Sequence, residues 1–386
     1  MQETNTPQTP KGRILAIDTG PAATKVGFFV DGTAVREETL PFPPEKAAGL
    51  GGVMDQEPLR KQDVTDFLAR AGFGLGDIDV VMARGGLFAP VVTGVYRVGR
   101  DMRDVLMTCR DGTHACNLSA VIADDIADSV NEYRQEKGIP APFGPCQAYI
   151  ADPPMADEML PECHLTGIPE LPRRAFFHAL NSRATVKQYL RDKGRSGADV
   201  TAIVAHLGRG ITVTLHHGGK VIDTNNGLGG DGPFTADRAG SIPALDLVSL
   251  CYSGQFTEAQ MRRKILGGGG AMGWFGTADL DALSRRAREG DPECSLFMKA
   301  FCLNIAKQIA ATAATVEGKV DVILLTGDTA SLASVCEAIA RRVRFIAPVE
   351  TYPGEHALQS LAENGYAVLE GTVRVHRYDK NAIVPD

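Results

Sequence analysis

Short apolar segments separated by tight turns open the chain. Three consecutive segments have the composition of strands: GRILAID at 12–18, KVGFFV at 25–30 and TAVREETL at 33–40. Asp31-Gly32 joins the last two, and an Asp-Gly pair between two such segments is a strong signal for a β-hairpin. The pattern predicts a three-stranded antiparallel meander.

The same order of segments returns about 190 residues later, as VTAIVAH at 200–206, ITVTLH at 211–216 and KVIDTNNG at 220–227. In both places a glycine-containing turn separates the first strand from the second. A repeated supersecondary pattern indicates duplication. The chain is therefore predicted to contain two similar domains.

Strands and helices alternate through the rest of the chain, which is typical of the α/β class. Further strands are expected at 77–83, 145–154, 320–327 and 344–349, and helices at 117–134, 174–191, 296–316, 331–342 and 356–364. We predict domains at 12–178 and 179–386 that flank a central cleft, with the last helix packing back on the first domain and a disordered tail at 1–11.

Composition narrows the class of protein. The 386 residues include 40 Lys+Arg and 47 Asp+Glu, a net charge of −7, which argues against nucleic acid as a partner. No apolar segment approaches the ~20 residues of a membrane span, so no membrane partner is expected. The eight cysteines are scattered without a CxxC pair, which favours reduced thiols and a cytoplasmic location. Glycine is abundant, at 42 residues, as expected where loops approach a phosphate.

The turn after the first strand of each meander is a candidate phosphate site. In the first, Asp18, Thr19 and Gly20 precede Lys25, and backbone N–H groups of such a turn can approach phosphate oxygens while Asp18 holds Mg²⁺. In the second, the equivalent turn is His206-Leu-Gly-Arg-Gly210. The alternative for each is an ordinary hairpin whose polar residue caps the turn.

Other candidates stand where predicted elements begin or end. Arg84 ends a strand and Arg238 lies in a loop, and arginine suits bidentate binding of carboxylate or phosphate. His178 begins an apolar helix, Asp152 follows a strand, and Glu355 precedes a helix. For every one of these residues a purely structural role is the alternative. The run Gly267–Gly270 lacks the Lys-Ser/Thr of a P-loop and is interpreted as a flexible loop.

Taken together, six segments resemble the butyrate kinases, a branch of the acetate-kinase group, in order and spacing from about residue 13 to 375. They are ARGGLFAPVVTGVYRV, THACNLSAVIADDIA, IPELPRRAFFHALN, IVAHLGRGITV, RAGSIPALDLVSLCYSG and FIAPVETYPGE. The resemblance implies two duplicated ribonuclease H-like domains of the actin, sugar-kinase and Hsp70 type. It also implies reversible phosphoryl transfer from ATP, with Mg²⁺, to a short carboxylic acid such as butyrate, by a homodimer or higher homo-oligomer.

The resemblance also implies roles for individual residues. The transferred phosphoryl group and the carboxylate would be contacted by His178, His206, Arg84 and Arg238, with Asp152 near the metal. Glu355 would also lie near Mg²⁺, and the nucleotide would be bound by Gly208, Gly210, Gly327 and Asp279. The first turn adds Asp18 as a candidate for Mg²⁺, and Thr19, Gly20 and Lys25 as candidates for the nucleotide.

Four positions depart from the family pattern. The first turn reads Asp18-Thr-Gly-Pro-Ala-Ala where the family has Asn-x-Gly-Ser-Thr-Ser, so three hydroxyls are replaced and a carboxylate is added. Arg209, Asp281 and Asp328 are the other three. These changes leave two alternatives open beside a carboxylate kinase: a kinase or ATPase of the same superfamily with another acceptor, and a catalytically weakened, non-enzymatic paralogue.

Overall fold

The chain folds into two compact units in the computed structural model, which describes residues 11–195 and 200–380. The first unit runs to Ala156 and resumes at His356, and the second comprises Asp157–Glu355. Residues 157–178, predicted for the first domain, belong to the second unit, whereas the chain after Glu355 returns to the first unit, where the last helix was expected to pack. The predicted tail at 1–11 lies, except for Lys11, outside the described residues.

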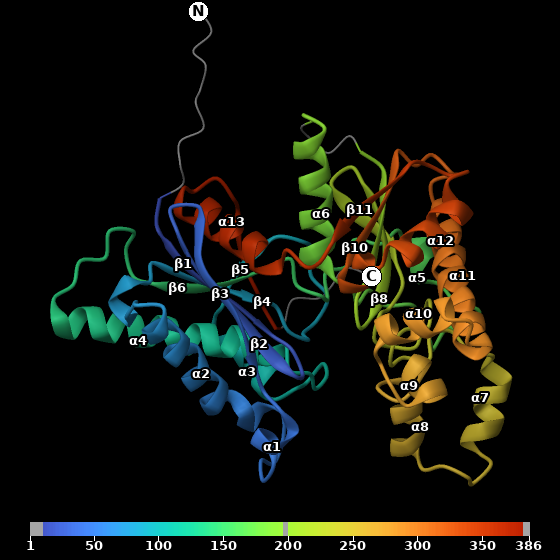
Figure 1. Ribbon diagram of the computed structural model, residues 1–386. Helices are drawn as coiled ribbons and strands as arrows, with labels where there is room; N and C mark the ends of the chain where they lie inside the picture. Colours follow the sequence, from blue (N-terminus) through green and yellow to red (C-terminus); the bar gives the residue numbers. More distant parts are fainter. Residues whose placement is uncertain (1–10, 196–199, 381–386) are drawn as a thin grey trace, which may run out of the picture. The chain divides into compact units, whose positions relative to one another are not determined.

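A seven-stranded sheet forms the centre of the first unit, in the order β12-β5-β6-β4-β1-β2-β3 (Figure 1). The predicted meander is confirmed, since β1 and β2 pair antiparallel, as do β2 and β3, while β4 lies parallel to both β1 and β6. The strands are β1 Arg13–Thr19, β2 Ala23–Val30, β3 Thr33–Pro41, β4 Val80–Arg84, β5 Val95–Arg97, β6 Gln147–Ala151 and β12 Val375–Arg377.

Helices cover both faces of this sheet. Strand residues alternate between faces, so Leu15 and Val81 join the core beneath α4, while α13 meets the opposite face, where Gly365 lies against Ile14 and Met82. The helices are α1 Pro44–Ala47, η1 Met54–Gln56, α2 Glu57–Arg70, η2 Leu75–Asp77, α3 Arg100–Met107, α4 Asn117–Lys137 and α13 Ala357–Leu369.

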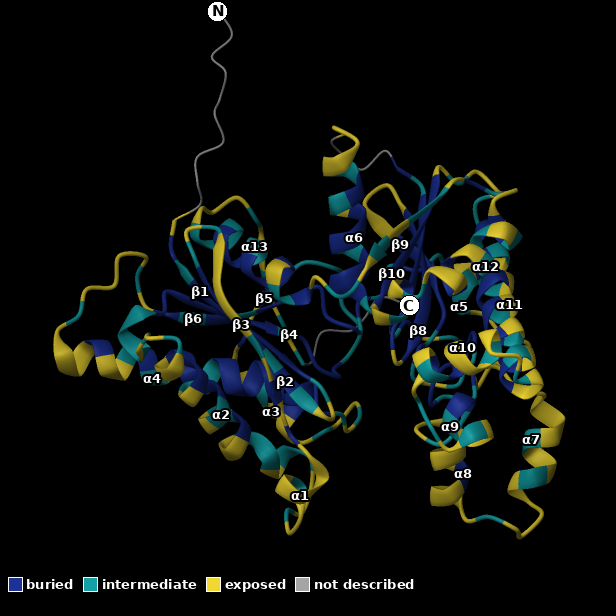
Figure 2. Ribbon diagram, viewed as in Figure 1, coloured by how far each residue is buried: buried dark blue, intermediate teal, exposed yellow. Residues whose placement is uncertain are grey.

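The second unit repeats the arrangement with five strands in the order β11-β10-β7-β8-β9. Strands β7, β8 and β9 form the second predicted meander, and β10 lies parallel to both β7 and β11. This order matches β6-β4-β1-β2-β3 strand for strand, which supports duplication. The strands are β7 Ala202–Leu207, β8 Ile211–His217, β9 Lys220–Thr224, β10 Val322–Gly327 and β11 Val349–Pro353. Figure 2 shows the central strands of both sheets buried, whereas the outer strand β3 is largely exposed.

The second unit contains nine helical segments among its described residues. They are α5 Pro161–His164, α6 Ala179–Asp192, α7 Ala244–Cys251, α8 Glu258–Ile265, α9 Gly270–Phe275, α10 Leu280–Arg288, α11 Pro292–Ala314, η3 Asp328–Ser331 and α12 Ala333–Val343. Of these, α6, α11, α12 and η3 contact the sheet. None of the helices in the described part of the chain is both long and apolar enough to cross a membrane.

Among the predicted boundaries in this unit that are wrong, two show where the local pattern misleads. Helix α6 begins at Ala179 instead of residue 174, because the preceding residues are irregular and His178 is the N-cap. The strand predicted at 344–349 is a turn that leaves Phe345 exposed, and β11 begins only at Val349, after Pro348. The apolar composition of residues 344–349 predicts a strand, but this segment turns at the protein surface.

Candidate active site

Three predicted residues of the first unit meet at one edge of its sheet. Asp18 is near the end of β1, Arg84 ends β4 and Asp152 follows β6, and these three strands are parallel neighbours. Carboxyl ends of parallel strands are where α/β sheets bind ligands. Arg84 Nη1 lies 3.4 Å from Asp18 Oδ1, and Asp18 is only 5% exposed. The carboxylate that departs from the family pattern therefore has a cation beside it.

Asp152 is held in place by a backbone contact. Its Oδ1 accepts the Gly94 N–H at 3.0 Å, and its own N–H donates to the Gly94 carbonyl at 2.9 Å. The residue has φ +41°, an uncommon conformation for a non-glycine. These contacts tie the start of β5 to the end of β6, and a role near the metal stays a prediction.

The first turn connects β1 to β2. Lys25 is the cross-strand partner of Asp18, so both side chains lie on one face of the sheet. The Thr19 N–H donates to Ser119 Oγ at 2.8 Å, and the Thr19 hydroxyl is buried without a hydrogen-bond partner in the described chain. The Gly20 N–H is used within the turn, by the Ala23 carbonyl.

A buried arginine supports this turn from behind. Arg60, on α2, is fully buried; it donates to Thr24 Oγ1 at 3.0 Å and to the Pro21 carbonyl at 3.2 Å, and it stacks on the Phe42 ring. Burial lowers the pKa of Arg60 to about 10, so the guanidinium remains charged at neutral pH. Sequence reasoning missed this residue, which puts positive charge under a turn that has lost its hydroxyls.

The second unit places an equivalent row of residues at the carboxyl ends of β7, β10 and β11. His206 on β7 is in register with Thr326 on β10, and Glu355 follows β11. His206 is 1% exposed, with Nε2 at 3.5 Å from Glu355 Oε1 and Nδ1 at 2.9 Å from Asn181 Nδ2. The predicted residues His206 and Glu355 thus lie together, and Asn181, which was not predicted, lies beside them.

The two predicted histidines lie against each other. The rings of His178 and His206 are stacked with centroids 3.8 Å apart and an interplanar angle of 14°. His178 Nδ1 is 2.9 Å from the hydroxyl of Thr212 on β8. Thr212 and Asn181 were missed, although Asn181 follows His178 by one helical turn, a spacing that places both on one face of α6.

The second turn contacts both His206 and Arg238. A Cβ on Gly208 would lie 2.6 Å from His206 Nε2, and a Cβ on Gly210 would collide with the Arg238 guanidinium. Only glycine leaves room for these side chains. Arg238 Nη1 donates to the Gly227 carbonyl, and Arg209 Nε pairs with Asp237. Arg209, a departure from the family pattern, therefore helps hold the loop that carries Arg238.

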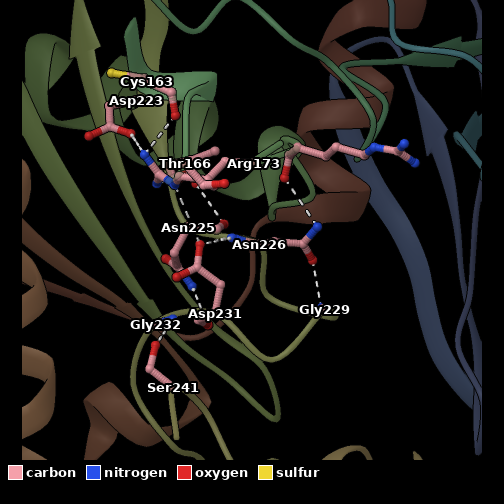
Figure 3. A network of polar contacts seen from close by, with 12 residues as sticks. Cys163, Thr166, Arg173, Asp223, Asn225, Asn226, Gly229, Asp231, Gly232 and Ser241 are labelled. Carbon is pink, nitrogen blue, oxygen red and sulfur yellow. Dashed lines mark hydrogen bonds and ion pairs between the residues drawn. The ribbon is translucent and has the colours of Figure 1, made fainter. Parts of the chain in front are cut away.

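A polar network anchors that loop to the segment before α6 (Figure 3). Arg173 donates to Asp223 Oδ1 at 3.2 Å and to the Thr224 carbonyl at 2.7 Å. Asn226 donates through its side chain to the Arg174 carbonyl, and its own N–H is accepted by the carboxylate of Asp231. The network fixes the path of the chain from β9 toward Arg238.

The glycine run at 267–270 also packs on this loop. The N–H groups of Gly267 and Gly269 both donate to the Asp237 carbonyl, at 2.8 and 3.2 Å. A Cβ on Gly269 would lie 2.6 Å from the Ala239 nitrogen. The segment interpreted as a flexible loop is thus a close backbone-to-backbone contact.

The remaining predicted nucleotide residues lie farther along the second unit. Gly327 has φ +89°, and a Cβ there would be 2.7 Å from the Leu207 backbone, so β10 and β7 approach closely. Asp279 caps α10 by accepting the Ala282 N–H at 2.9 Å. Asp328 is exposed at the start of η3, and Asp281 forms a surface pair with Arg285. A role for Asp279 toward a nucleoside stays a prediction.

Asp18 and Glu355 suit a Mg²⁺ ion that is bound only partly by the protein, as is typical of kinases. No group of three or more His, Cys, Asp or Glu that could hold a metal occurs among residues 11–195 and 200–380. Magnesium in kinases is usually bound by one or two carboxylates together with waters and substrate phosphates. Asp18 and Glu355 each supply oxygen ligands of the kind Mg²⁺ prefers, so the donors are suitable for a metal that arrives with the nucleotide.

Comparison with known proteins decides the family. Residues 170–352 match the model of the acetokinase family. The chain is 38% identical over 366 residues to butyrate kinase 1 of Clostridium acetobutylicum, covering 95% of this chain and 99% of the relative. The chain belongs to the butyrate kinases of the acetokinase family. Membership makes it a phosphotransferase with a carboxyl group as acceptor, and as a kinase it uses ATP or ADP.

Solved structures confirm the fold class. Acetate kinase of Porphyromonas gingivalis superposes with a TM-score of 0.71 at 15% identity, covering 92% of this chain and all of that one. Propionate kinase of Francisella tularensis gives a TM-score of 0.69, covering 92% of this chain and 98% of that one. The predicted α/β fold with two duplicated actin-type domains is that of these kinases.

Proposed function

We propose that this butyrate kinase homologue transfers the γ-phosphoryl group of Mg-ATP to a short-chain carboxylic acid such as butyrate. The products are an acyl phosphate and ADP, and the reaction is reversible. The observation that carries the proposal is the stacked His178–His206 pair beside Glu355, with Gly208 leaving space at His206 Nε2.

The chemistry requires cations and hydrogen-bond donors rather than a base. A carboxylic acid with a pKa near 4–5 is already ionised at neutral pH, so its oxygen attacks phosphorus without proton removal. The two anions must be brought together and the charge on the transferred oxygens stabilised. In the second unit, His178, His206 and Arg238 are assigned this role, with the N–H groups of Gly208 and Gly210 toward the nucleotide phosphates and Gly327 and Asp279 toward the nucleoside.

The first unit is assigned the complementary role. Arg84 and Lys25 provide positive charge next to Asp18, and Arg60 adds a third cation behind Thr19 and Gly20. Three lost hydroxyls and one added carboxylate would otherwise disfavour phosphate at this turn. These cations support retained anion binding, and Asp152 is assigned to holding this edge of the sheet near the metal.

Asp18 and Glu355 are assigned as the carboxylates that serve Mg²⁺, together with phosphate oxygens. When bound it would neutralise charge on the phosphates. Asp18→Asn tests the assignment: activity should collapse at low Mg²⁺ and recover in part as Mg²⁺ is raised. Higher activity at every Mg²⁺ concentration would show that the carboxylate is only an electrostatic cost.

A homo-oligomer is also proposed, in which a second copy of this chain covers α7. No residue of this helix is buried, although its composition is apolar, and Leu245, Val248 and Tyr252 are 83%, 53% and 89% exposed. A helix of eight residues is not stable by itself in water, so α7 requires a partner surface. Leu245→Glu with Val248→Glu should yield monomers in light scattering, whereas Glu substitution at the exposed Val35 on β3 should not. The free cysteines support a cytoplasmic location.

The decisive experiment is a trap for the acyl phosphate. Purified protein is incubated with Mg-ATP and acids of two to six carbons, and hydroxylamine converts any acyl phosphate to a hydroxamate. Hydroxamate with at least one acid is expected, and its absence with every acid would refute the proposal. ADP release with hydroxyl acceptors instead would favour another kinase of the superfamily, and no product from an intact oligomer would favour a non-enzymatic paralogue.

A matched pair of histidine variants links the activity to the site. His178→Ala removes one ring of the stacked pair and should lower kcat at least 100-fold, a loss of about 3 kcal/mol of transition-state stabilisation. His217→Ala removes an exposed histidine at the end of β8 and should leave kcat unchanged. Equal rates for the two variants would exclude the stacked pair from catalysis.

A further inference from the structure

We infer that Asn181 and Thr326 fix the tautomer of His206, so that this histidine acts as a hydrogen-bond donor through Nε2–H toward the reacting oxygens. The inference rests on the proposed function for its catalytic meaning. The tautomer itself follows from hydrogen bonding within the second unit.

The chain of hydrogen bonds begins at a carbonyl, which can only accept. Thr326 Oγ1 lies 3.2 Å from the Gly354 carbonyl oxygen, so the single hydroxyl hydrogen points there. Thr326 Oγ1 is also 3.3 Å from the side-chain amide of Asn181. Having donated its hydrogen, the hydroxyl must accept in this second contact, and the amide must present its nitrogen.

The orientation of the Asn181 amide then determines the histidine. The same Nδ2 that faces Thr326 lies 2.9 Å from His206 Nδ1. Two N–H groups cannot point at each other, so His206 Nδ1 carries no hydrogen and accepts. The ring proton of neutral His206 is therefore on Nε2.

The protonated nitrogen lies next to Glu355 and Gly208. His206 Nε2 is buried without a hydrogen-bond partner in the described chain, with Glu355 Oε1 beyond it at 3.5 Å. A Cβ at position 208 would lie 2.6 Å from Nε2, and the glycine keeps that position free of a side chain. An N–H in this place stabilises negative charge on oxygen, whereas a bare nitrogen would repel it. Asn181 is thus a positioning residue.

The tautomer is measured directly by NMR. A long-range ¹H–¹⁵N correlation spectrum of the ¹⁵N-labelled full chain, with His206 assigned by its loss in His206→Gln, should show a bare Nδ1 and a protonated Nε2. In Asn181→Asp the carboxylate can only accept, so the proton should move to Nδ1. A protonated Nδ1 in the natural protein would overturn the inference whether or not the protein makes acyl phosphate.

Kinetics tests whether the tautomer matters to the reaction. Asn181→Asp should lower kcat by about 10- to 100-fold, the loss typical when the group orienting a functional residue is removed, with less change in KM for the acid. Thr326→Val should give a mixture of the two tautomers, so its kcat should lie between the kcat of Asn181→Asp and that of the natural protein.

A control on the same helix separates positioning from packing. Thr185 is fully buried on α6, and its hydroxyl bonds the backbone carbonyl of Asn181 at 2.8 Å without touching His206. Thr185→Val should change neither the His206 spectrum nor kcat. If Asn181→Asp moved the proton but left kcat unchanged, or Thr185→Val lowered kcat equally, the positioning role would be refuted.

Discussion

The contact between Asp18 and Arg84 should contribute measurably to stability, because one partner is almost fully buried. At the observed 3.4 Å, two unit charges attract by about 5 kcal/mol at an effective dielectric constant of 20. Desolvation of Asp18 offsets part of this, and the Arg84 side chain is 27% exposed. We therefore expect a coupling energy of about 1–3 kcal/mol between the two residues.

A double-mutant cycle measures the coupling. Arg84→Met should lower the free energy of unfolding by about 2–4 kcal/mol, because it removes the ion-pair partner of a buried carboxylate and leaves only Lys25 beside it. Asp18→Asn should cost less, and the double variant should recover part of the loss. All four proteins are unfolded in urea at neutral pH and followed by circular dichroism, with equal m-values as the condition for comparison.

An exposed pair of the same type provides the reference. Arg262 and Glu258 on α8 form an i,i+4 pair with both side chains nearly four-fifths exposed, and such pairs contribute about 0.3–0.5 kcal/mol. If the coupling between Asp18 and Arg84 were no larger than this reference, Arg84 would not be the counterion that compensates the unusual carboxylate.

Three further predictions concern the second unit. Burial lowers the pKa of His216 to about 3, so below about pH 6.5 the unfolded state binds a proton that the folded state does not, and stability falls by about 1.4 kcal/mol per pH unit down to pH 3. His216→Gln should reduce this slope in urea titrations between pH 7 and 5, and exposed His217→Gln should not. Gly327→Ala should lower the free energy of unfolding by about 2–5 kcal/mol, because it adds backbone strain and a clash. Gly254→Ala is also at positive φ but has open space, so it should lower the free energy of unfolding by only about 1 kcal/mol. Thermal unfolding distinguishes the two variants. Asp291→Ala removes a side chain that caps α11 through two backbone N–H groups and should cost about 1 kcal/mol in the same assay; an unchanged midpoint would contradict the cap.

Local sequence signals located some boundaries and misplaced others. The start of α11 was placed at residue 296, although Asp291 followed by Pro292 is a standard N-cap and first-position pair, and the helix indeed begins at Pro292. The start of α6 had no such signal, since His178 is its N-cap and the capping is not made by the side chain. Boundaries without a capping residue depend on packing and could not be predicted.

The sequence by itself determined the two meanders, their glycine turns and the residue types at strand ends, because strand periodicity and turn chemistry are local properties. Only the tertiary structure decided which strand ends are neighbours. Asp18 and Arg84 are 66 residues apart, and Asn181 and Thr326 are 145 residues apart. Asp18 meets Arg84 because the parallel strands β1 and β4 align their carboxyl ends, and Asn181 meets Thr326 because α6 packs against β10. Neither kind of pairing leaves a mark in one segment alone.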